Sequence, residues 1–241
     1  MSRITEKTKI KEKRGTGKGA DYKPWILARE VGSIGTESVF PDWKHGRQIQ
    51  CLSQGEAKAY RLLRWRDDVA DIREQYPLDL DLTLAIARRI GLPHPHDRKT
   101  HMTTDFLVTY DTPDGKVLKA YTVKPNISHF TDYVLKNFAI EQAYWGVKGI
   151  HLEVIFSDKI SPVFAENIKR CVRYYDLKSV QSKIDFVKFL IARKIIKVDM
   201  YHNIDFPKLV GHYLKTGEDI QYYNSVYQQT RASPYPVVHG K

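Results

Sequence analysis

Apolar residues recur along the chain with two periods, and together they predict a mixed α/β part followed by a helical part. Between residues 53 and 156 the spacing predicts a helix, a strand, a helix, a two-stranded hairpin, a long helix and a final strand. Because both hairpin strands are apolar on both faces over part of their length, we expect an α/β domain with a mixed central sheet flanked by helices. The predicted segments are Ser53 to about Trp65, Val69–Tyr76, Leu82–Ile90, Thr104–Lys124, Phe130–Val147 and His151–Phe156.

The pattern changes at Pro162, after which helical spacing dominates. These residues predict a small, mostly helical domain over residues 163–241, with a winged-helix module as one form of it. Such a domain suits DNA binding or the docking of a partner protein, and the sequence does not separate these two roles. The predicted helices are Val163–Tyr174, Val180–Ile196 and roughly Phe206–Tyr227, and Lys197–Met200 could form a short strand.

Residues 1–24 are rich in Lys, Arg, Thr and Gly and hold few apolar side chains. Such a segment buries too little apolar surface to offset the entropy lost on ordering it, so we expect a basic disordered arm. Its Gly15–Gly19 stretch lacks the spacing of a phosphate-binding loop, and no strand is predicted before it. The predicted organisation is therefore an arm at 1–24, an α/β domain at 25–162 and a helical domain at 163–241.

The formal net charge of +11 is unevenly distributed. Residues 1–24 hold 8 Lys and Arg against 3 Asp and Glu, and residues 163–241 hold 13 against 7. The part between them is balanced, with 18 of each sign. A neutral middle between basic ends favours an enzyme domain whose flanks bind a polyanion such as nucleic acid.

Cysteine usage and hydropathy exclude several classes of protein. Cys51 and Cys171 lie far apart without a second nearby ligand, which predicts two buried thiols rather than a disulfide framework or a zinc site. We find no apolar run long enough to span a bilayer and no signal peptide, so we expect a soluble cytoplasmic protein with no membrane partner. His94, His96 and His101 lie in or near a Pro-containing loop, and we interpret this loop as solvated rather than metal-binding.

The predicted hairpin carries the most informative chemistry. Asp105 begins its first strand and Lys124 ends its second, 19 positions later, so folding the hairpin can bring the two side chains together. Charged groups at the ends of buried strands are costly unless each has a partner. Either a structural salt bridge between the two or a bound cation would meet that need.

Two glutamates are candidates for the same site. Ser53 to Glu56 matches a capping box, in which the Glu56 carboxylate would reach back to the backbone N–H of Ser53. That structural role competes with metal binding. Glu141 lies within the long predicted helix, where we expect an exposed carboxylate, and a supporting role at the site stays open.

The oxygens of Glu56 and Asp105 suit Mg²⁺, for which Mn²⁺ can substitute. One or two such ions polarise a scissile phosphate and lower the pKa of an attacking water. A neighbouring lysine such as Lys124 can orient that water or offset charge on the phosphorus. This set of two carboxylates and a lysine is typical of restriction-endonuclease-like nucleases, although the spacing alone is common.

A longer ordered set of motifs resembles the TnsA family, the endonuclease subunit of heteromeric bacterial cut-and-paste transposases. The resemblance covers about residues 29–175, and Gln75, Pro77 and the MTTDF run at 102–106 are its most specific parts. The motifs are GRQIQCLSQGEAKAYRLL, VADIREQYPL, IARRIGLPHP, HMTTDFLVTY, YTVK and FAIEQAYW.

The resemblance implies a restriction-endonuclease-like catalytic domain at 25–162. It implies that Glu56 and Asp105 bind the metal and that Lys124 is catalytic. Thr122 occupies the position two before the lysine, where this fold often has Gln or an acid. The backbone carbonyl of Val123 is then the expected further metal ligand.

The same resemblance implies cleavage of the strand at the 5′ ends of a mobile element, with DNA as substrate. It further implies a TnsB-like transposase that cuts and joins the 3′ ends, and a TnsC-like ATPase regulator that docks on the C-terminal region. Two alternatives remain open at this point. One is a stand-alone restriction or junction-resolving nuclease on the same fold, and the other is a non-catalytic DNA-binding or docking subunit.

Overall fold

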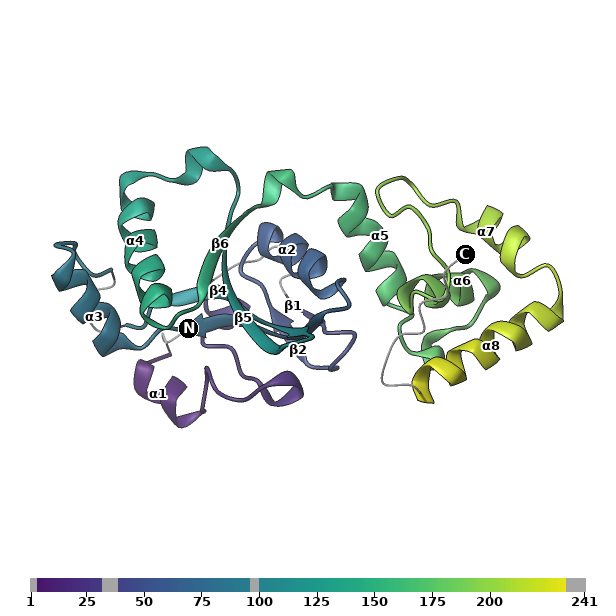
Figure 1. The fold of residues 1–241 in the computed structure, drawn as a ribbon, viewed down its shortest axis with the longest axis horizontal. Coiled ribbons are helices and arrows are strands. Elements are labelled where there is room, and N and C mark those ends of the chain that lie inside the picture. Colours follow the sequence, from purple (N-terminus) through teal and green to yellow (C-terminus); the bar gives the residue numbers. More distant parts are fainter. Residues whose placement is uncertain (1–3, 32–38, 96–99, 233–241) are drawn as a thin grey trace. The chain divides into compact units, whose positions relative to one another are not determined.

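A four-stranded mixed sheet organises the first of two units in the chain (Figure 1). The computed structural model describes residues 4–31, 39–95 and 100–232. These residues belong to unit 1, Met1–Ile160, and unit 2, Ser161–Lys241. The division falls two residues before the boundary that the sequence predicts.

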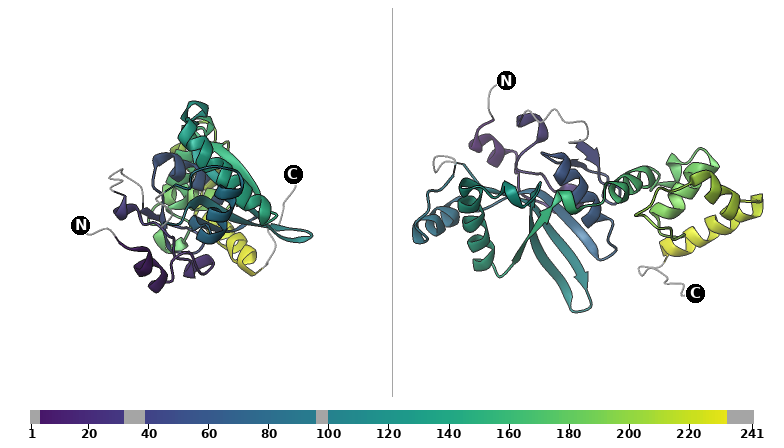
Figure 2. Two further views of the ribbon diagram at one scale, coloured as in Figure 1. Left: turned by 90° about the vertical axis from the view of Figure 1, so that its left-hand side faces the viewer. Right: turned by 90° about the horizontal axis from the view of Figure 1, so that it is seen from above.

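The sheet of unit 1 has the strand order β3-β4-β5-β6. Its first two pairings are antiparallel, whereas β5 and β6 are parallel and joined through helix α4. Helices α2 and α4 cover opposite faces of the sheet, and α3 packs against α4 (Figures 1 and 2). This architecture confirms the predicted α/β fold with a mixed sheet flanked by helices. The elements are α2 (Gln54–Arg64), β3 (Val69–Pro77), α3 (Leu80–Arg89), β4 (Thr103–Thr112), β5 (Gly115–Lys124), η4 (Ile127–His129), α4 (Asp132–Val147), β6 (His151–Phe156) and η5 (Ser157–Lys159).

Each face of the sheet buries apolar side chains against one helix. On the α4 face, Leu107 and Ala120 belong to a core cluster with Trp145. On the α2 face, the ring of Phe106 lies 6.2 Å from that of Tyr60. The far end of the β4–β5 hairpin, residues 111–116, is exposed and projects from the unit (Figure 2). The chemistry predicted for this hairpin lies at its other, covered end.

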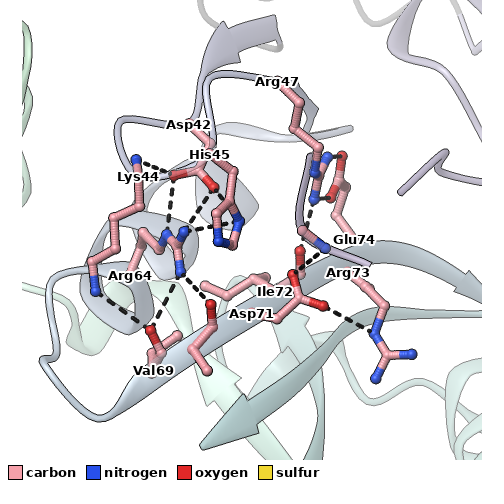
Figure 3. A network of polar contacts seen from close by, with 12 residues as sticks. Asp42, Lys44, His45, Arg47, Arg64, Val69, Asp71, Ile72, Arg73 and Glu74 are labelled. Atoms are coloured by element: carbon pink, nitrogen blue, oxygen red, sulfur yellow. Dashed lines mark hydrogen bonds and ion pairs between the residues drawn. The ribbon is translucent and has the colours of Figure 1, made fainter. Parts of the chain in front are cut away.

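A short ribbon of β1 (Val39–Pro41) and β2 (Gln48–Gln50) is tied to α2 and β3 by buried ion pairs (Figure 3). Arg64, at the end of α2, donates two hydrogen bonds of 3.0 Å to Asp42. Arg47 donates two, of 2.7 and 2.6 Å, to Glu74 of β3. Arg64 and Glu74 are both 0% exposed, so the charges are paired away from water. Burial and the charge of Arg64 lower the pKa of His45 beside this network, which favours a neutral imidazole.

Strand β3 departs from regular alternation at Gln75. Glu74 faces Arg47 on the side of the ribbon, whereas Tyr76, two positions later, lies 5.9 Å from Trp145 of α4. Side chains two positions apart in a regular strand share one face. The backbone of Gln75 has φ 48°, in the left-handed region that residues other than glycine rarely adopt. This conformation turns the strand, so that Glu74 and Tyr76 point to opposite faces of the sheet.

Strand β4 changes face at the same level. Thr104 bonds to Glu141 of α4, whereas Phe106 contacts Tyr60 of α2. The residue between them is Asp105, which lies across from Gln75, between the paired positions on either side. The positions at which β3 and β4 change face, Gln75 and Asp105, therefore lie at the predicted site.

Residues 4–31 fold against the sheet, and the expectation of a disordered arm up to residue 24 is wrong for the part described. They form α1 (Glu6–Lys11), η1 (Gly19–Asp21) and η2 (Ala28–Glu30). Tyr22 and Trp25 are each 3% exposed, and the buried Arg14 pairs with Glu12 and Glu30. Two aromatic side chains and several polar contacts order this segment, which a count of apolar residues does not capture.

The glycine-rich stretch at 15–19 forms a turn that packs on β3. Gly15 has φ 74°, and a Cβ atom there would overlap the ring of Pro77. Its N–H donates to the Lys23 carbonyl at 2.6 Å. The N–H of Gly19 donates to Asp71 of β3 at 3.2 Å. Glycine is required at position 15 by close packing as well as by its backbone angle.

Unit 2 is helical, as predicted for the C-terminal region. Its core contains Phe189, Leu190 and Ile168, each 0% exposed. The described residues 161–232 contain no strand, and Lys197–Met200 lies in an irregular segment, so these residues do not build the wing of a winged helix. The elements are α5 (Pro162–Val172), η6 (Leu177–Ser179), α6 (Lys183–Ala192), α7 (Phe206–Tyr213) and α8 (Gly217–Ala232).

Cys51 and Cys171 are both 0% exposed and unbridged, as the sequence predicts. His94 is buried, with Nε2 3.0 Å from the hydroxyl of Thr83, so the interpretation of its loop as solvated is wrong at this position. His96 lies outside the described residues. Over the ranges that the structure describes, none of the helices has both the length and the apolar character needed to cross a bilayer.

Candidate active site

Asp105 lies where β4 separates from β5. The hairpin register ends at Phe106↔Tyr121, and β5 then continues alongside β6. Asp105 Oδ2 accepts a hydrogen bond of 2.6 Å from the backbone N–H of Val123 and one of 3.3 Å from the hydroxyl of Thr122. Its other oxygen, Oδ1, has no hydrogen-bond partner among the described residues. Asp105 Oδ2 thus accepts the Val123 N–H, as a backbone carbonyl of a paired strand would do. Oδ1 remains available to another ligand.

Lys124 is connected to Asp105 through Thr122. Lys124 Nζ donates to Thr122 Oγ1 at 3.1 Å, and that hydroxyl donates onward to Asp105 Oδ2. A hydroxyl can donate one bond while accepting another, so both contacts form together. The direct salt bridge considered for Asp105 and Lys124 is not formed in the described part of the chain. Thr122, 2% exposed, therefore aligns the lysine with the carboxylate.

The backbone N–H and carbonyl of Val123 face the gap where β4 separates from β5. Its N–H points at Asp105. In an extended strand the N–H and C=O of one residue lie on the same side, because directly bonded residues exchange both groups. The carbonyl oxygen of Val123 accordingly lies on the Asp105 side of β5.

Glu56 is fixed at the first turn of α2. Ser53 caps the helix, because its Oγ accepts the N–H of Glu56 at 3.1 Å. Glu56 Oε2 accepts from the backbone N–H of Leu52 at 2.8 Å and from Gln75 Nε2 at 3.0 Å, and Oε1 accepts from Ser53 Oγ at 3.1 Å. The predicted cap is present, but the backbone donor is Leu52 instead of Ser53. Glu56 is 7% exposed, and capping does not consume all of its acceptor capacity.

Both carboxyl groups of this site have a raised pKa. Burial, followed by the negative charge of Asp105, raises the pKa of Glu56 to about 8. Removal from water likewise raises the pKa of Asp105, and the positive charge of Lys124 opposes this shift. Two like charges held close together in a poorly hydrated site favour protonation or a bound cation.

The donor set fits a hard divalent cation. Mg²⁺ is commonly held by one or two carboxylates and completes its shell with water and substrate phosphate. Glu56 and Asp105 supply two carboxylates, and the Val123 carbonyl supplies a neutral oxygen nearby. Within 4–31, 39–95 and 100–232, His, Cys, Asp and Glu side chains form no group of three suited to a metal ion. A cation at this site would therefore depend on main-chain, water or phosphate oxygens as well.

Glu141 is buried beside the site, and the expectation of an exposed helical carboxylate is wrong. It is 7% exposed, and its Oε1 accepts a 2.7 Å hydrogen bond from Thr104 Oγ1. The same hydroxyl accepts from Trp145 Nε1 at 2.7 Å. Burial, and then the charge of Asp105, raises the pKa of Glu141 to about 8. Glu141 thus adds a third acidic group to the electrostatics of the site.

Glu141→Gln is expected to stabilise the metal-free protein, and the gain should grow with pH. Between the ordinary pKa near 4.5 and the folded value of about 8, the folded chain keeps a proton that the unfolded chain has lost. Stability therefore falls as pH rises through this window, by up to about 1.4 kcal/mol per pH unit. Glutamine has no such proton to lose. Urea unfolding in EDTA should show a gain of roughly 2–4 kcal/mol at pH 8 relative to pH 4.5, and a constant difference would contradict the assignment.

Sequence reasoning proposed Glu56, Asp105 and Lys124 as the site residues. In the structure Lys124 is linked to Asp105 through Thr122, and Asp105 acts electrostatically on Glu56. Sequence reasoning missed Gln75, whose side chain contacts Glu56, and the bridging role of Thr122. The only sequence signal for Gln75 was that it belongs to a motif of the family, and that motif did not indicate what the residue does.

The chain is similar to proteins of DNA transposition. Residues 66–157 match the family described as TnsA-like endonuclease N terminal, a range that contains Asp105 and Lys124. Over 172 residues the chain is 37% identical to the Transposon Tn7 transposition protein TnsA of Escherichia coli. The alignment covers 70% of this chain and spans 62% of the length of that relative. These similarities support the assignment of the chain to the TnsA family.

Proposed function

We propose that this chain is a metal-dependent DNA endonuclease that works as one subunit of a heteromeric transposase. The observation that carries the proposal is the pair of buried carboxyl groups, Glu56 and Asp105, which interact electrostatically, with Lys124 linked to Asp105 through Thr122. Support also comes from the similarity to a transposition protein and to a family described as endonucleases. Its substrate is the strand at the 5′ ends of a mobile element.

In the proposed mechanism, Glu56 and Asp105 bind Mg²⁺ with the carbonyl of Val123, and Mn²⁺ can substitute. The ion supplies Lewis-acid activation of water and phosphate when bound. Both carboxylates would be ionised while they hold the ion, since a ligating carboxylate must be ionised. Thr122 holds Lys124 beside Asp105, so the ammonium group can orient the attacking water or offset charge that develops on the phosphate.

The proposed assembly includes DNA, a TnsB-like transposase that processes the 3′ ends, and a TnsC-like ATPase regulator. These partners follow from the resemblance to the TnsA family. Unit 2 would bind DNA or a partner protein. The reaction would take place in the bacterial cytoplasm, where the DNA lies.

Lys124→Ala is expected to lower 5′-strand cleavage by about 10²–10³-fold, because one positioned charge near the reacting phosphate typically contributes that much. Cleavage is measured on an end-labelled transposon-end duplex with the partner transposase and Mg²⁺ present. The affinity for Mn²⁺ should change little, since Lys124 is not a ligand.

Lys119→Ala is the matched control, because Lys119 lies on the same strand and pairs with Glu153 at 2.8 Å, away from Asp105. It should cleave like the unmodified chain. Equal loss in both variants would argue against a specific role for Lys124. Cleavage by the chain without any partner would instead support a stand-alone nuclease, and no cleavage under any condition would support a non-catalytic subunit.

A further inference from the structure

Gln75 contacts three different parts of unit 1, and one of these contacts is with Glu56 of the site. Its Nε2 donates to Glu56 Oε2 at 3.0 Å, and its Oε1 accepts from Thr103 Oγ1 at 3.3 Å. Its backbone carbonyl accepts from the N–H of Trp25 at 3.1 Å, in the folded N-terminal segment. The residue is 1% exposed. One side chain thus joins helix α2 to the start of β4.

The orientation of the amide follows from its neighbours. An ionised Glu56 can only accept hydrogen bonds, so the NH₂ end of Gln75 must face it. The hydroxyl of Thr103 then donates to the amide oxygen on the other side. Both ends of the amide are engaged, which removes its freedom to flip.

The hydrogen bonds to Glu56 leave it one open acceptor position. A carboxylate has about four lone-pair positions, two on each oxygen. Leu52 and Gln75 fill both on Oε2, and Ser53 fills one on Oε1. The remaining position is on Oε1. Because the Gln75 amide is neutral, it fixes the carboxylate without cancelling the charge that a cation needs.

The backbone of Gln75 carries a cost that its neighbours offset. A left-handed conformation at a residue other than glycine costs of order 1–3 kcal/mol and persists where the surroundings enforce it. The Trp25 N–H and the two side-chain hydrogen bonds supply those surroundings. With φ 48°, the side chain leaves the strand in the direction of α2.

We propose that Gln75 is a positioning residue that orients Glu56 so that its Oε1 oxygen is presented to a divalent cation shared with Asp105. This inference rests on the proposed metal-dependent function. Gln75 itself touches neither the cation nor the DNA. Its contribution is measured as metal affinity.

Gln75→Asn is the main test, because asparagine tolerates left-handed backbone but is one methylene too short to span Glu56 and Thr103. Mn²⁺ affinity of the full chain is measured by calorimetry and by the electron paramagnetic resonance of free Mn²⁺. We expect the dissociation constant to rise about 10–100-fold, as for other groups that orient metal ligands. Gln75→Gly removes the side chain while keeping the left-handed backbone accessible, and it should show the same loss of Mn²⁺ affinity.

The control is Gln142→Asn, at an exposed position of α4, which should bind Mn²⁺ like the unmodified chain. Unchanged Mn²⁺ affinity in Gln75→Asn and Gln75→Gly would overturn the inference even if both variants cleave DNA more slowly. Absence of Mn²⁺ binding by the unmodified chain would instead overturn the metal-dependent function on which the inference rests. The two failures are therefore distinguishable.

Discussion

Asp105→Asn should reduce 5′-strand cleavage by roughly 10³-fold or more, equivalent to about 4 kcal/mol of transition-state stabilisation, because it removes one of two charged metal ligands. The fold should survive the change. Asparagine matches aspartate in size and can offer its amide oxygen to the N–H of Val123 and the hydroxyl of Thr122. The loss should therefore be chemical and not a consequence of unfolding.

The same variant should alter how stability responds to metal and pH. Burial raises the pKa of Asp105, so the metal-free folded chain retains a proton that the unfolded chain has lost, and stability falls as pH rises across that interval. Asp105→Asn removes this dependence. Thermal unfolding with and without Mg²⁺ should show stabilisation by the ion in the unmodified chain and little in the variant.

Asp111→Asn provides the comparison, since Asp111 lies on the same strand at the exposed end of the hairpin. It should cleave normally and keep its response to Mg²⁺. Retention of more than about a tenth of the cleavage rate by Asp105→Asn would be incompatible with Asp105 as a metal ligand.

The largest effect on stability is expected from Asp42→Ala. Asp42 and Arg64 are 3% and 0% exposed, and the substitution leaves the Arg64 guanidinium buried without its carboxylate. Breaking a buried pair on one side costs roughly 3–5 kcal/mol, since the remaining charge is neither hydrated nor paired. Urea unfolding at neutral pH, followed by circular dichroism, measures the change.

A second Arg–Asp pair, which is exposed, allows the effect of burial on stability to be measured with the same two residue types. Arg66 donates to Asp68 at 2.9 and 2.6 Å, but these side chains are 55% and 42% exposed. Asp68→Ala should cost less than about 1 kcal/mol, because water solvates the freed guanidinium. Equal costs for Asp42→Ala and Asp68→Ala would show that burial does not set the strength of the network in Figure 3.

The order of elements in unit 1 was predictable because each long element carries a run of apolar residues at helical or strand spacing, even though β3 and β4 change face within their length. Strands β3, β4, β5 and β6 and helices α2, α3 and α4 all lie where apolar spacing predicts them. Ribbon β1–β2 was missed, since strands of three residues among glycines and prolines are too short to show a period. The N-terminal segment was missed because pairs such as Arg14 with Glu30 order it, and ion pairs between distant residues leave no local pattern.

The sequence allows the residue types of the candidate site to be predicted. It does not allow the contacts that hold these residues in place to be predicted. Glu56, Asp105 and Lys124 follow from chemistry and resemblance. The left-handed backbone of Gln75 does not, since glutamine has no preference for it. The burial of Glu141 depends on Thr104 changing face within β4, which is a property of the folded sheet and not of α4.

The folded N-terminal segment determines how its positive charge can act on a polyanion. A flexible basic tail sweeps a volume larger than the domain and captures DNA from a distance. Lys9 and Arg14 are instead tied to Glu30, and their charges stay at fixed points on unit 1. Such charges act only over the Debye length, about 8 Å at physiological ionic strength. If the chain binds DNA as proposed, this segment would act only on DNA already close to unit 1, and it would extend the capture radius of the chain very little.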